Sequence, residues 1–359
     1  MMYEWPEDDP FLEEGEPYIP EEKASLVPLI DADSLLYKAG FASQHKRFRF
    51  HSDSAITELY SNTTIKAKKE TEGQEGYIEE YTDVESVGLA INNLSVSVQV
   101  ILNSLEDLNF NIDEPIVYVA GIGVSNFRDD IATTQPYKGN RLWRYDNNGE
   151  IHYCVSRTLA ECFDEMSSKV DKVIASKFKK PAGKPYHYEA LRQWLVHAYN
   201  TLEIRDVEVD DAIGLAQCKN TILCHLDKDL WQVPGHHWDY GKQKYLYVDP
   251  DSLGILELTP KGDLFGTYIA WFYAQMLLGD SADHIRGITK VGPKKAFKLL
   301  GSFETEYDLF GPVVNEYKRE FNDNWKQRFF ENAQLLWIQR HGEVDVCPRL
   351  TKLIMITGA

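Results

Sequence analysis

The sequence predicts an α/β protein in which helices flank a mostly parallel sheet. Short apolar runs at residues 25–33, 114–121 and 220–229 lack polar alternation, and each ends in Asp or Gly. Such runs are typical of strands that are buried on both faces. The stretches between them are long enough for the helices that connect parallel strands. With 359 residues, the chain can form one large domain or two smaller ones.

Helical patterns follow the first strand and precede the third. Residues 186–200 place their apolar side chains at helical spacing. Residues 94–105 fit both a strand and a helix, because their apolar side chains satisfy both periods. We favour a helix, since a connection is needed between the strands that end near Asp31 and Gly121.

The last third of the chain is predicted to be mainly helical. Residues 244–259 predict a β-hairpin that turns around residues 250–254. After it, residues 268–279 and 325–340 have the apolar content and length of helices. Residues 41–85 are largely polar and predict an exposed insertion.

Composition argues against several classes of protein. No apolar run reaches the roughly 18 to 20 residues that a membrane helix needs, and the acidic N-terminus is unlike a signal peptide. The 5 cysteines include no C-x-x-C pair, which argues against a disulfide framework and a zinc knuckle. We therefore expect a soluble, cytoplasmic protein with reduced thiols and no membrane partner.

The net charge of −18 at first argues against a nucleic-acid partner. Residues 1–24, however, hold nine acids and one base among four prolines, as a disordered acidic arm does, and leave −10 for the rest of the chain. Residues 138–184 carry ten basic against six acidic residues, and residues 284–298 carry five against none. Positive charge is therefore gathered in two segments.

Carboxylates stand where apolar runs end. The loops after parallel strands converge on one crevice, so acids distant in sequence are expected to meet there. They would repel one another strongly and stay ionised only with cations among them. All-oxygen ligands suit Mg²⁺ or Mn²⁺, and two such ions are an arrangement for splitting phosphodiesters. Taken singly, each Asp fits a turn or a helix cap equally well. The candidates are Asp31, Glu208, Asp210, Asp211, Asp227, Asp229, Asp280 and Asp283.

The segment 284–301 predicts a phosphate site. Gly287 and Gly292 flank a tight hairpin, and Pro293 suits the first position of a helix. The N–H groups of Gly292, Lys294 and Lys295 would then point outward at the helix N-terminus, a ready site for a phosphate, and Lys298 adds charge.

A second basic segment lies at residues 126–144. Its cations would neutralise a phosphate in the transition state, and Tyr137 would stack on an unpaired base. Considered alone, such a segment is more often a charged loop. The cations are Arg128, Lys138, Arg141 and Arg144.

These patterns, in this order, resemble the 5′ nuclease family: flap endonucleases, the 5′ nuclease domains of bacterial DNA polymerases and, above all, bacteriophage 5′-to-3′ exonucleases. The correspondence covers roughly residues 26–340, and its last motif is the most specific because the acids and the glycine hairpin keep their spacing. The motifs are LIDADSLLY, FRDDIATTQPYKGNR, EVDDAIG, LDKDL and LLGDSADHIRGITKVGPKKAFKLL.

The resemblance implies a domain organisation. A twisted PIN-like nuclease domain would occupy residues 25–240, with a helical arch at 138–185. A C-terminal helical region would follow at 241–359 and contain a helix–hairpin–helix element at 279–301. The hairpin between Gly287 and Gly292 would hold a K⁺ through backbone carbonyls.

The resemblance also implies roles for the site residues. One Mg²⁺ or Mn²⁺ would be held by Asp31, Glu208 and Asp210, with Asp211 beside them. A second would be held by Asp227, Asp229 and Asp280, with support from Asp283. Lys138 and Arg141 would approach the scissile phosphate. Substrate DNA would be bound by Arg128, Tyr137, Arg144, Gly292, Lys294, Lys295 and Lys298.

The sequence departs from the family at two places. The family usually ends its second strand with another Asp, whereas here the run stops at Gly121. The first metal site therefore lacks a usual ligand unless Asp33 or a water substitutes, and Asp33 shares a face with Asp31 only if the strand continues. The arch segment between Arg144 and Lys184 is also longer than in the phage relatives.

The leading hypothesis is a metal-dependent 5′-to-3′ exonuclease or flap endonuclease of phage DNA replication, repair or recombination. It would act as a monomer on DNA with a 5′ end, nick, gap or flap and leave 5′-phosphates. Two alternatives are a pseudo-nuclease that binds branched DNA and a PIN-type ribonuclease. The acidic arm either shields the basic cleft or docks on a replication protein, and the sequence leaves both open.

Overall fold

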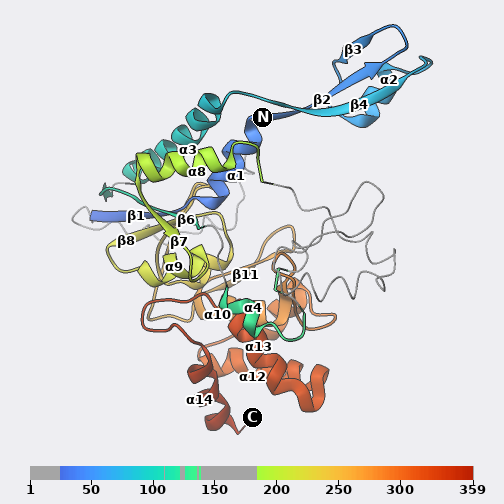
Figure 1. Ribbon diagram of the computed structural model, residues 1–359. Coiled ribbons are helices and arrows are strands. Elements are labelled where there is room, and N and C mark those ends of the chain that lie inside the picture. The colour runs from blue at the N-terminus through green and yellow to red at the C-terminus, as the bar shows by residue number, and fades with distance from the viewer. Residues whose placement is uncertain (1–24, 109, 122–125, 136, 139–183, 359) are drawn as a thin grey trace.

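The molecule is built on a seven-stranded, mostly parallel sheet (Figure 1). This computed structural model describes residues 25–108, 110–121, 126–135, 137–138 and 184–358. The acidic arm, Arg141, Arg144 and nearly all of the predicted arch lie outside the described residues. The strands are β1 (Ser25–Asp31), β5 (Asn111–Ile112), β6 (Ile116–Ala120), β7 (Asn200–Ile204), β8 (Thr221–His225), β9 (Gly235–Asp239) and β10 (Lys244–Val248).

The three predicted strands are β1, β6 and β8, and their parallel pairing places their carboxyl ends on the same side of the sheet. The order across the sheet is β10-β9-β8-β1-β6-β7, with β5 beside β1. Only β10 runs antiparallel to its neighbour. In the register, Ile30 lies between Val117 of β6 and Cys224 of β8. The fold class predicted from the sequence is therefore confirmed.

Helices cover both faces of the sheet, which explains why the strands lack polar alternation. One face packs Ile30, Val117 and Cys224 against α1 (Asp33–Ala42), α3 (Val87–Asp107) and α8 (Tyr188–Ala198). The other face packs Leu29 and Leu223 against α9 (Val209–Ala216).

The ambiguous segment 94–105 is a helix, as predicted. It belongs to α3, whose buried residues recur at helical spacing and contact α1 and α8. Val96 and Val100, which suggested a strand, point outward and are about half exposed. By length and composition alone, α3 is the one helix among the described residues that could cross a membrane. Here its buried stripe, which comprises Ala90, Leu94, Val98, Ile101 and Leu105, lies in the protein core.

The segment between α1 and α3 forms a small sheet that projects from the body (Figure 1). Its strands β2 (Gln44–His51), β3 (Ile56–Leu59) and β4 (Tyr77–Val84) pair antiparallel in the order β3-β2-β4. Phe48 and Phe50 are buried, as is Ala67 of α2 (Thr64–Glu70). At the base, the backbone N–H of Glu85 donates to the carbonyl of Ser43 at 2.9 Å.

The predicted hairpin at residues 244–259 is wrong. Its first half is the edge strand β10, which pairs with β9, and its second half is β11 (Leu256–Leu258), which pairs with β12 (Leu264–Gly266). Gly254 adopts a φ of +81°, and a Cβ there would lie 2.0 Å from the carbonyl oxygen of Thr267. The chain therefore turns away from β10 and packs beside the segment that leads into α10 (Tyr268–Leu278).

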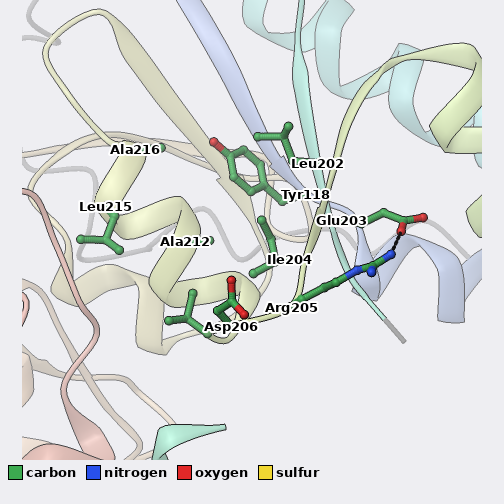
Figure 2. Close-up of a pocket in the computed structure, with 10 residues that line it drawn as sticks. Tyr118, Leu202, Glu203, Ile204, Arg205, Asp206, Ala212, Leu215 and Ala216 are labelled. Atoms are coloured by element: carbon green, nitrogen blue, oxygen red, sulfur yellow. Dashed lines mark hydrogen bonds and ion pairs between the residues drawn. The ribbon is translucent and has the colours of Figure 1, made fainter. Parts of the chain in front are cut away.

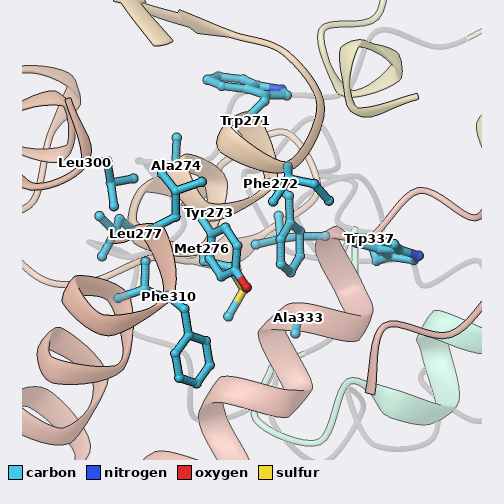
Figure 3. Close-up of a cluster of buried hydrophobic side chains, with 14 of the residues drawn as sticks. Trp271, Phe272, Tyr273, Ala274, Met276, Leu277, Leu300, Phe310, Ala333 and Trp337 are labelled. Carbon is cyan, nitrogen blue, oxygen red and sulfur yellow. The ribbon is translucent and has the colours of Figure 1, made fainter. Parts of the chain in front are cut away.

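The C-terminal part is mainly helical, as the sequence predicts, and its buried side chains pack around α10 (Figure 3). Trp271, Phe272 and Met276 on this helix contact α11 (Pro293–Leu300), α12 (Glu306–Phe321) and α13 (Trp325–Leu336). The last helix is α14 (Cys347–Thr357). Two short strands, β13 (Gly279–Asp280) and β14 (Ile285–Arg286), pair between α10 and α11 and complete a helix, hairpin and helix in succession.

Candidate active site

A cluster of carboxylates lies at the carboxyl ends of β1 and β8. Asp31 is the last residue of β1, and Asp227 follows β8 by two residues. Asp210 lies in the first turn of α9, which packs against β1 and β6. The acidic cluster brings together every predicted carboxylate except Asp211, and it adds Asp33. Its members are Asp31, Asp33, Glu208, Asp210, Asp227, Asp229, Asp280 and Asp283.

Burial and mutual repulsion raise the pKa of several of these acids. Burial raises the pKa of Asp31 to about 7, and the charges of Asp33 and Asp227 add to the effect. The pKa of Asp210 is raised well above its ordinary value by burial and then by Asp227 and Asp31. Divalent cations would relieve this repulsion, so the all-oxygen donor set fits Mg²⁺ or Mn²⁺.

The side chains are not arranged as a closed coordination shell. Among the residues that the structure describes, no three or more His, Cys, Asp or Glu side chains converge in a geometry that holds a metal ion as they stand. Lysine ammonium groups contact the carboxylates instead. The donor set therefore fits a divalent ion in its chemistry, while Lys138 pairs with Glu208 and Asp283, and Lys228 with Asp229 and Asp280.

The second group of acids surrounds Lys228. Asp229 begins the short helix η2 (Asp229–Gln232), and Asp280 lies in β13. Burial raises the pKa of Asp229 to about 7, with further contributions from Asp227 and Asp280. The Lys228 ammonium is 3.0 Å from Asp229 Oδ1 and also donates to Asp280. Gln275 Nε2 of α10 donates to the same Asp229 oxygen at 2.5 Å.

Tyr137 and Lys138 close one side of the acidic cluster. The Tyr137 hydroxyl lies 2.9 Å from both Glu208 Oε2 and Asp283 Oδ2, and the Lys138 ammonium donates to Glu208. Burial works to raise the pKa of Glu208, but Lys138 and Arg128 outweigh it and lower that pKa. Tyr137 is only 4% exposed, so its ring has no open face on which a terminal base could stack in this structure. Its hydroxyl instead bridges two of the acids.

Arg128 and Asp211 form an ion pair in the protein interior. Arg128 is 1% exposed and Asp211 is fully buried, and the guanidinium donates to both carboxylate oxygens. Arg128 further donates to the carbonyls of Leu335 and Trp337, at 3.0 and 2.7 Å. The two side chains are therefore paired with each other in the interior, where Arg128 also lies 3.4 Å from Glu208.

The position that the family fills with Asp has no room for a side chain. A Cβ on Gly121 would lie 2.8 Å from the carbonyl oxygen of Ile204 and 2.7 Å from Arg205 Cγ. Asp33 starts α1 rather than continuing β1, so the condition for a shared strand face is not met. Its Oδ1 nevertheless accepts from the N–H of Ala120 at 3.2 Å, which places the carboxylate beside the end of β6.

The predicted phosphate site lies at the start of α11. Residues 288–291 form a tight turn, in which the N–H of Val291 donates to Ile288 at 3.1 Å. Gly292 is the N-cap, and Lys294 and Lys298 are exposed. Lys295 departs from the prediction, because its backbone N–H donates to Gly292 and its ammonium lies 3.6 Å from Glu316. The outward-facing cations of this helix are therefore Lys294 and Lys298.

Sequence reasoning missed two residues that contact the acids. Lys228 stands inside the D-K-D motif, so the sequence places it next to two of the acids. The sequence does not show whether its side chain contacts these acids or extends into solvent. Gln275 lies in an apolar helix, and nothing in the sequence shows that it faces Asp229.

A separate surface hollow lies beside the edge strand β7. It has a volume of about 580 Å³, and Leu202, Ile204 and Leu215 contribute apolar lining (Figure 2). Arg205 pairs with Glu203 at its rim, with 3.3 Å between the charged groups. None of the predicted site residues lines this hollow.

Comparison with known proteins finds related sequences. No protein-family model matches the chain. A flap endonuclease Xni of Shewanella sp. (strain ANA-3) is 30% identical over 181 residues, which are 46% of this chain and 65% of that protein. The Xni of Shewanella denitrificans is 30% identical over 160 residues, or 40% and 59% of the two chains. The matched segment thus spans less than two thirds of these relatives.

Solved structures of bacteriophage T5 proteins are similar in fold, at a distance. A T5 protein co-crystallised with metal ions is 14% identical, with coverage of 92% of this chain and 93% of its own and a TM-score of 0.45. A zinc-bound T5 5′-exonuclease is 14% identical over the same shares, with a TM-score of 0.42. From the two sequence relatives, the chain is similar to flap endonucleases over just under half of its length. Flap endonucleases are members of the 5′ nuclease family, which the motifs of this chain resemble.

Proposed function

We propose that the protein is a metal-dependent 5′ nuclease that hydrolyses phosphodiesters in DNA. The observation that carries the proposal is the convergence of buried acids from β1, α9, the end of β8 and β13 beside Lys138. A protein without cations at this place would gain nothing from burying so much negative charge. The similarity to flap endonucleases supports the same class of reaction.

The acids divide into two sets of ligands. Asp31, Glu208 and Asp210 would hold one Mg²⁺ or Mn²⁺, and Asp227, Asp229 and Asp280 a second, with Asp283 in support. Such ions, when bound, polarise the phosphate and lower the pKa of a coordinated water. The buried side of the cluster restricts bulk water, which strengthens each electrostatic contact inside it.

The remaining residues would bind and orient the DNA. Lys138 sits between Glu208 and Asp283, where its ammonium can exchange a carboxylate contact for one to the scissile phosphate. Lys294 and Lys298 would contact backbone phosphates without reading sequence. The 288–291 turn would hold a K⁺ through its carbonyls. We propose 5′ ends, nicks, gaps or flaps as substrates, 5′-phosphates as products, and a monomeric enzyme of phage DNA replication, repair or recombination.

The proposal is tested with 5′-labelled duplex and flap DNA in Mg²⁺. Asp227→Ala removes an acid placed between both metal sets and is expected to lower cleavage by about a hundredfold or more. Asp251→Ala, at an exposed loop position, is the matched control and is expected to cleave normally. Undiminished cleavage by Asp227→Ala would exclude the metal assignment.

Gly121 favours one alternative, a protein that binds branched DNA without cutting it. The usual acid of the family is absent here, and a side chain added at this position would meet the Ile204 carbonyl. Tight binding of flap DNA with no product in Mg²⁺ or Mn²⁺ would establish this alternative. Preferred cleavage of RNA over DNA in a competition assay would instead identify a ribonuclease.

A further inference from the structure

Lys228 lies across two carboxylates of the second proposed metal set. Its ammonium is 3.0 Å from Asp229 Oδ1 and donates to Asp280 Oδ2. Both acids are largely buried, with side chains 15% and 4% exposed, whereas the Lys228 side chain is 54% exposed. The lysine thus reaches from the surface onto acids that solvent contacts poorly.

The backbone of Lys228 is fixed while its side chain is not. The indole N–H of Trp271 donates to the Lys228 carbonyl at 3.0 Å, which attaches this residue to α10. The exposed four-carbon stem has rotatable bonds, and an ammonium is a compact point charge that leaves a carboxylate more readily than a bidentate guanidinium. The ammonium can therefore move away without displacing the two acids.

Neighbouring groups already satisfy the other oxygen of Asp280, and Gln275 shares Asp229 Oδ1 with Lys228. Asp280 Oδ1 accepts from the N–H groups of Ala282 and Asp283, at 2.7 and 3.3 Å. The oxygen of Asp280 that contacts Lys228 is thus the one that remains for a cation. A divalent ion bound through Asp280 Oδ2 or Asp229 Oδ1 would compete with the Lys228 ammonium for those oxygens.

We propose that Lys228 is a built-in counterion that competes with the divalent cation for Asp229 and Asp280. This inference rests on the proposed function, because it assumes that these acids bind metal. It has two consequences. Lys228 stabilises the metal-free protein by compensating buried charge, and it lowers the affinity of the second site, since metal binding requires the ammonium to leave.

The experiment measures Mn²⁺ binding to the full chain by calorimetry, without DNA. Lys228→Met keeps the length of the side chain and removes its charge. We expect it to melt at a lower temperature than the wild type in EDTA and to bind Mn²⁺ more tightly at one site. The gain should be on the order of fivefold, the size of one partly exposed ion pair.

Lys242→Met is the matched control. Lys242 forms a similar pair with Asp239, with 3.4 Å between the charged groups and the lysine side chain 59% exposed. The Lys242→Met variant should bind Mn²⁺ with the affinity of the wild type. Equal or weaker Mn²⁺ binding by Lys228→Met would overturn the inference, and so would an equal gain in Lys242→Met.

A second measurement does not depend on a stable variant. The wild-type lysines are dimethylated with ¹³C and the Lys228 resonance is assigned with Lys228→Arg. Displacement by Mg²⁺ should shift this resonance, and an unchanged resonance at saturating Mg²⁺ contradicts the competition. If the wild type binds no Mn²⁺ and cuts no DNA, the proposed function fails; if it does both and Lys228 gives no effect, only this inference fails.

Discussion

Arg128 of α4 (Phe127–Ile131) and Asp211 of α9 form a buried, bidentate ion pair, and Arg128 also donates to Trp337 in the segment after α13. The N–H of Gln339 donates to the same carboxylate at 3.0 Å, so the pair fixes the C-terminal helices against the sheet. It thereby sets where the first turn of α9, with Asp210, stands relative to β1. The pair thus positions part of the site from within the protein interior.

Removal of this guanidinium should destabilise the protein. Arg128→Met leaves Asp211 charged and buried, so we expect a loss of about 3–5 kcal/mol in the free energy of unfolding, measured by urea denaturation. Arg205→Met, at an exposed pair, should change it by less than about 1 kcal/mol. If Arg128→Met unfolded like the wild type while losing only DNA affinity, Arg128 would be a substrate residue after all.

Tyr137→Phe separates the two roles considered for this tyrosine. The variant keeps the ring and removes the hydroxyl that bridges Glu208 and Asp283. We expect cleavage to fall by about tenfold, the value of one or two hydrogen bonds within a charged cluster. A stacking role predicts no change, so single-turnover rates on flap DNA distinguish the two.

Gly121→Asp should not restore a fuller metal site. The added side chain would meet the Ile204 carbonyl at 2.8 Å, and backbone yields less readily than a side chain. We expect a loss of about 1–3 kcal/mol in stability and no gain in Mn²⁺ affinity. Gly88→Ala, whose nearest atom would lie at 3.9 Å, is the control and should not lower stability. Tighter Mn²⁺ binding by Gly121→Asp would show that the strand end can open.

His237 should make stability fall as the pH drops below about 6.5. It is fully buried, its Nε2 lies 2.7 Å from the Val233 carbonyl, and burial and then His225 lower its pKa well below the ordinary value. Above pH 6.5 the imidazole is neutral in both states. Below it the unfolded chain takes up a proton that the folded chain does not, which costs about 1.4 kcal/mol per pH unit.

The measurement is urea denaturation from pH 7 to pH 5. His237→Gln should show a shallower dependence of stability on pH than the wild type, whatever its absolute stability. His197→Gln changes an exposed helix residue and should follow the wild-type slope. Parallel slopes for His237→Gln and wild type would remove His237 as the cause.

Lys294 and Lys298 should act on DNA through charge alone. In the double Gln variant we expect weaker duplex binding at low salt and a plot of log affinity against log salt that is less steep by up to about two units. Cleavage at saturating DNA should stay near the wild-type rate. Lys352→Gln, on exposed α14, is the control. A double variant with the wild-type salt slope would remove α11 from the DNA interface.

The sequence predicted the acids of the site because strand ends can be located from apolar runs, and parallel strands bring their ends together. Asp31 and Asp227 lie in one cluster for this reason. It did not predict the partners of charged residues between the strands: Arg128 looks the same in sequence whether it faces solvent or a buried Asp. The hairpin at 244–259 failed similarly, because alternation identifies strands but not the strand with which each pairs.

The hydrogen bond between Ser43 and Glu85 has a consequence beyond the packing of the small projecting sheet. The chain leaves the body at Ser43 and returns to it beside the same residue, at Glu85. The 41 residues between these two positions therefore start and end at neighbouring points of the body. A short linker could join α1 to α3 in their place. This part of the molecule is therefore free to be lost, enlarged or exchanged between related proteins while the chemistry below it stays intact.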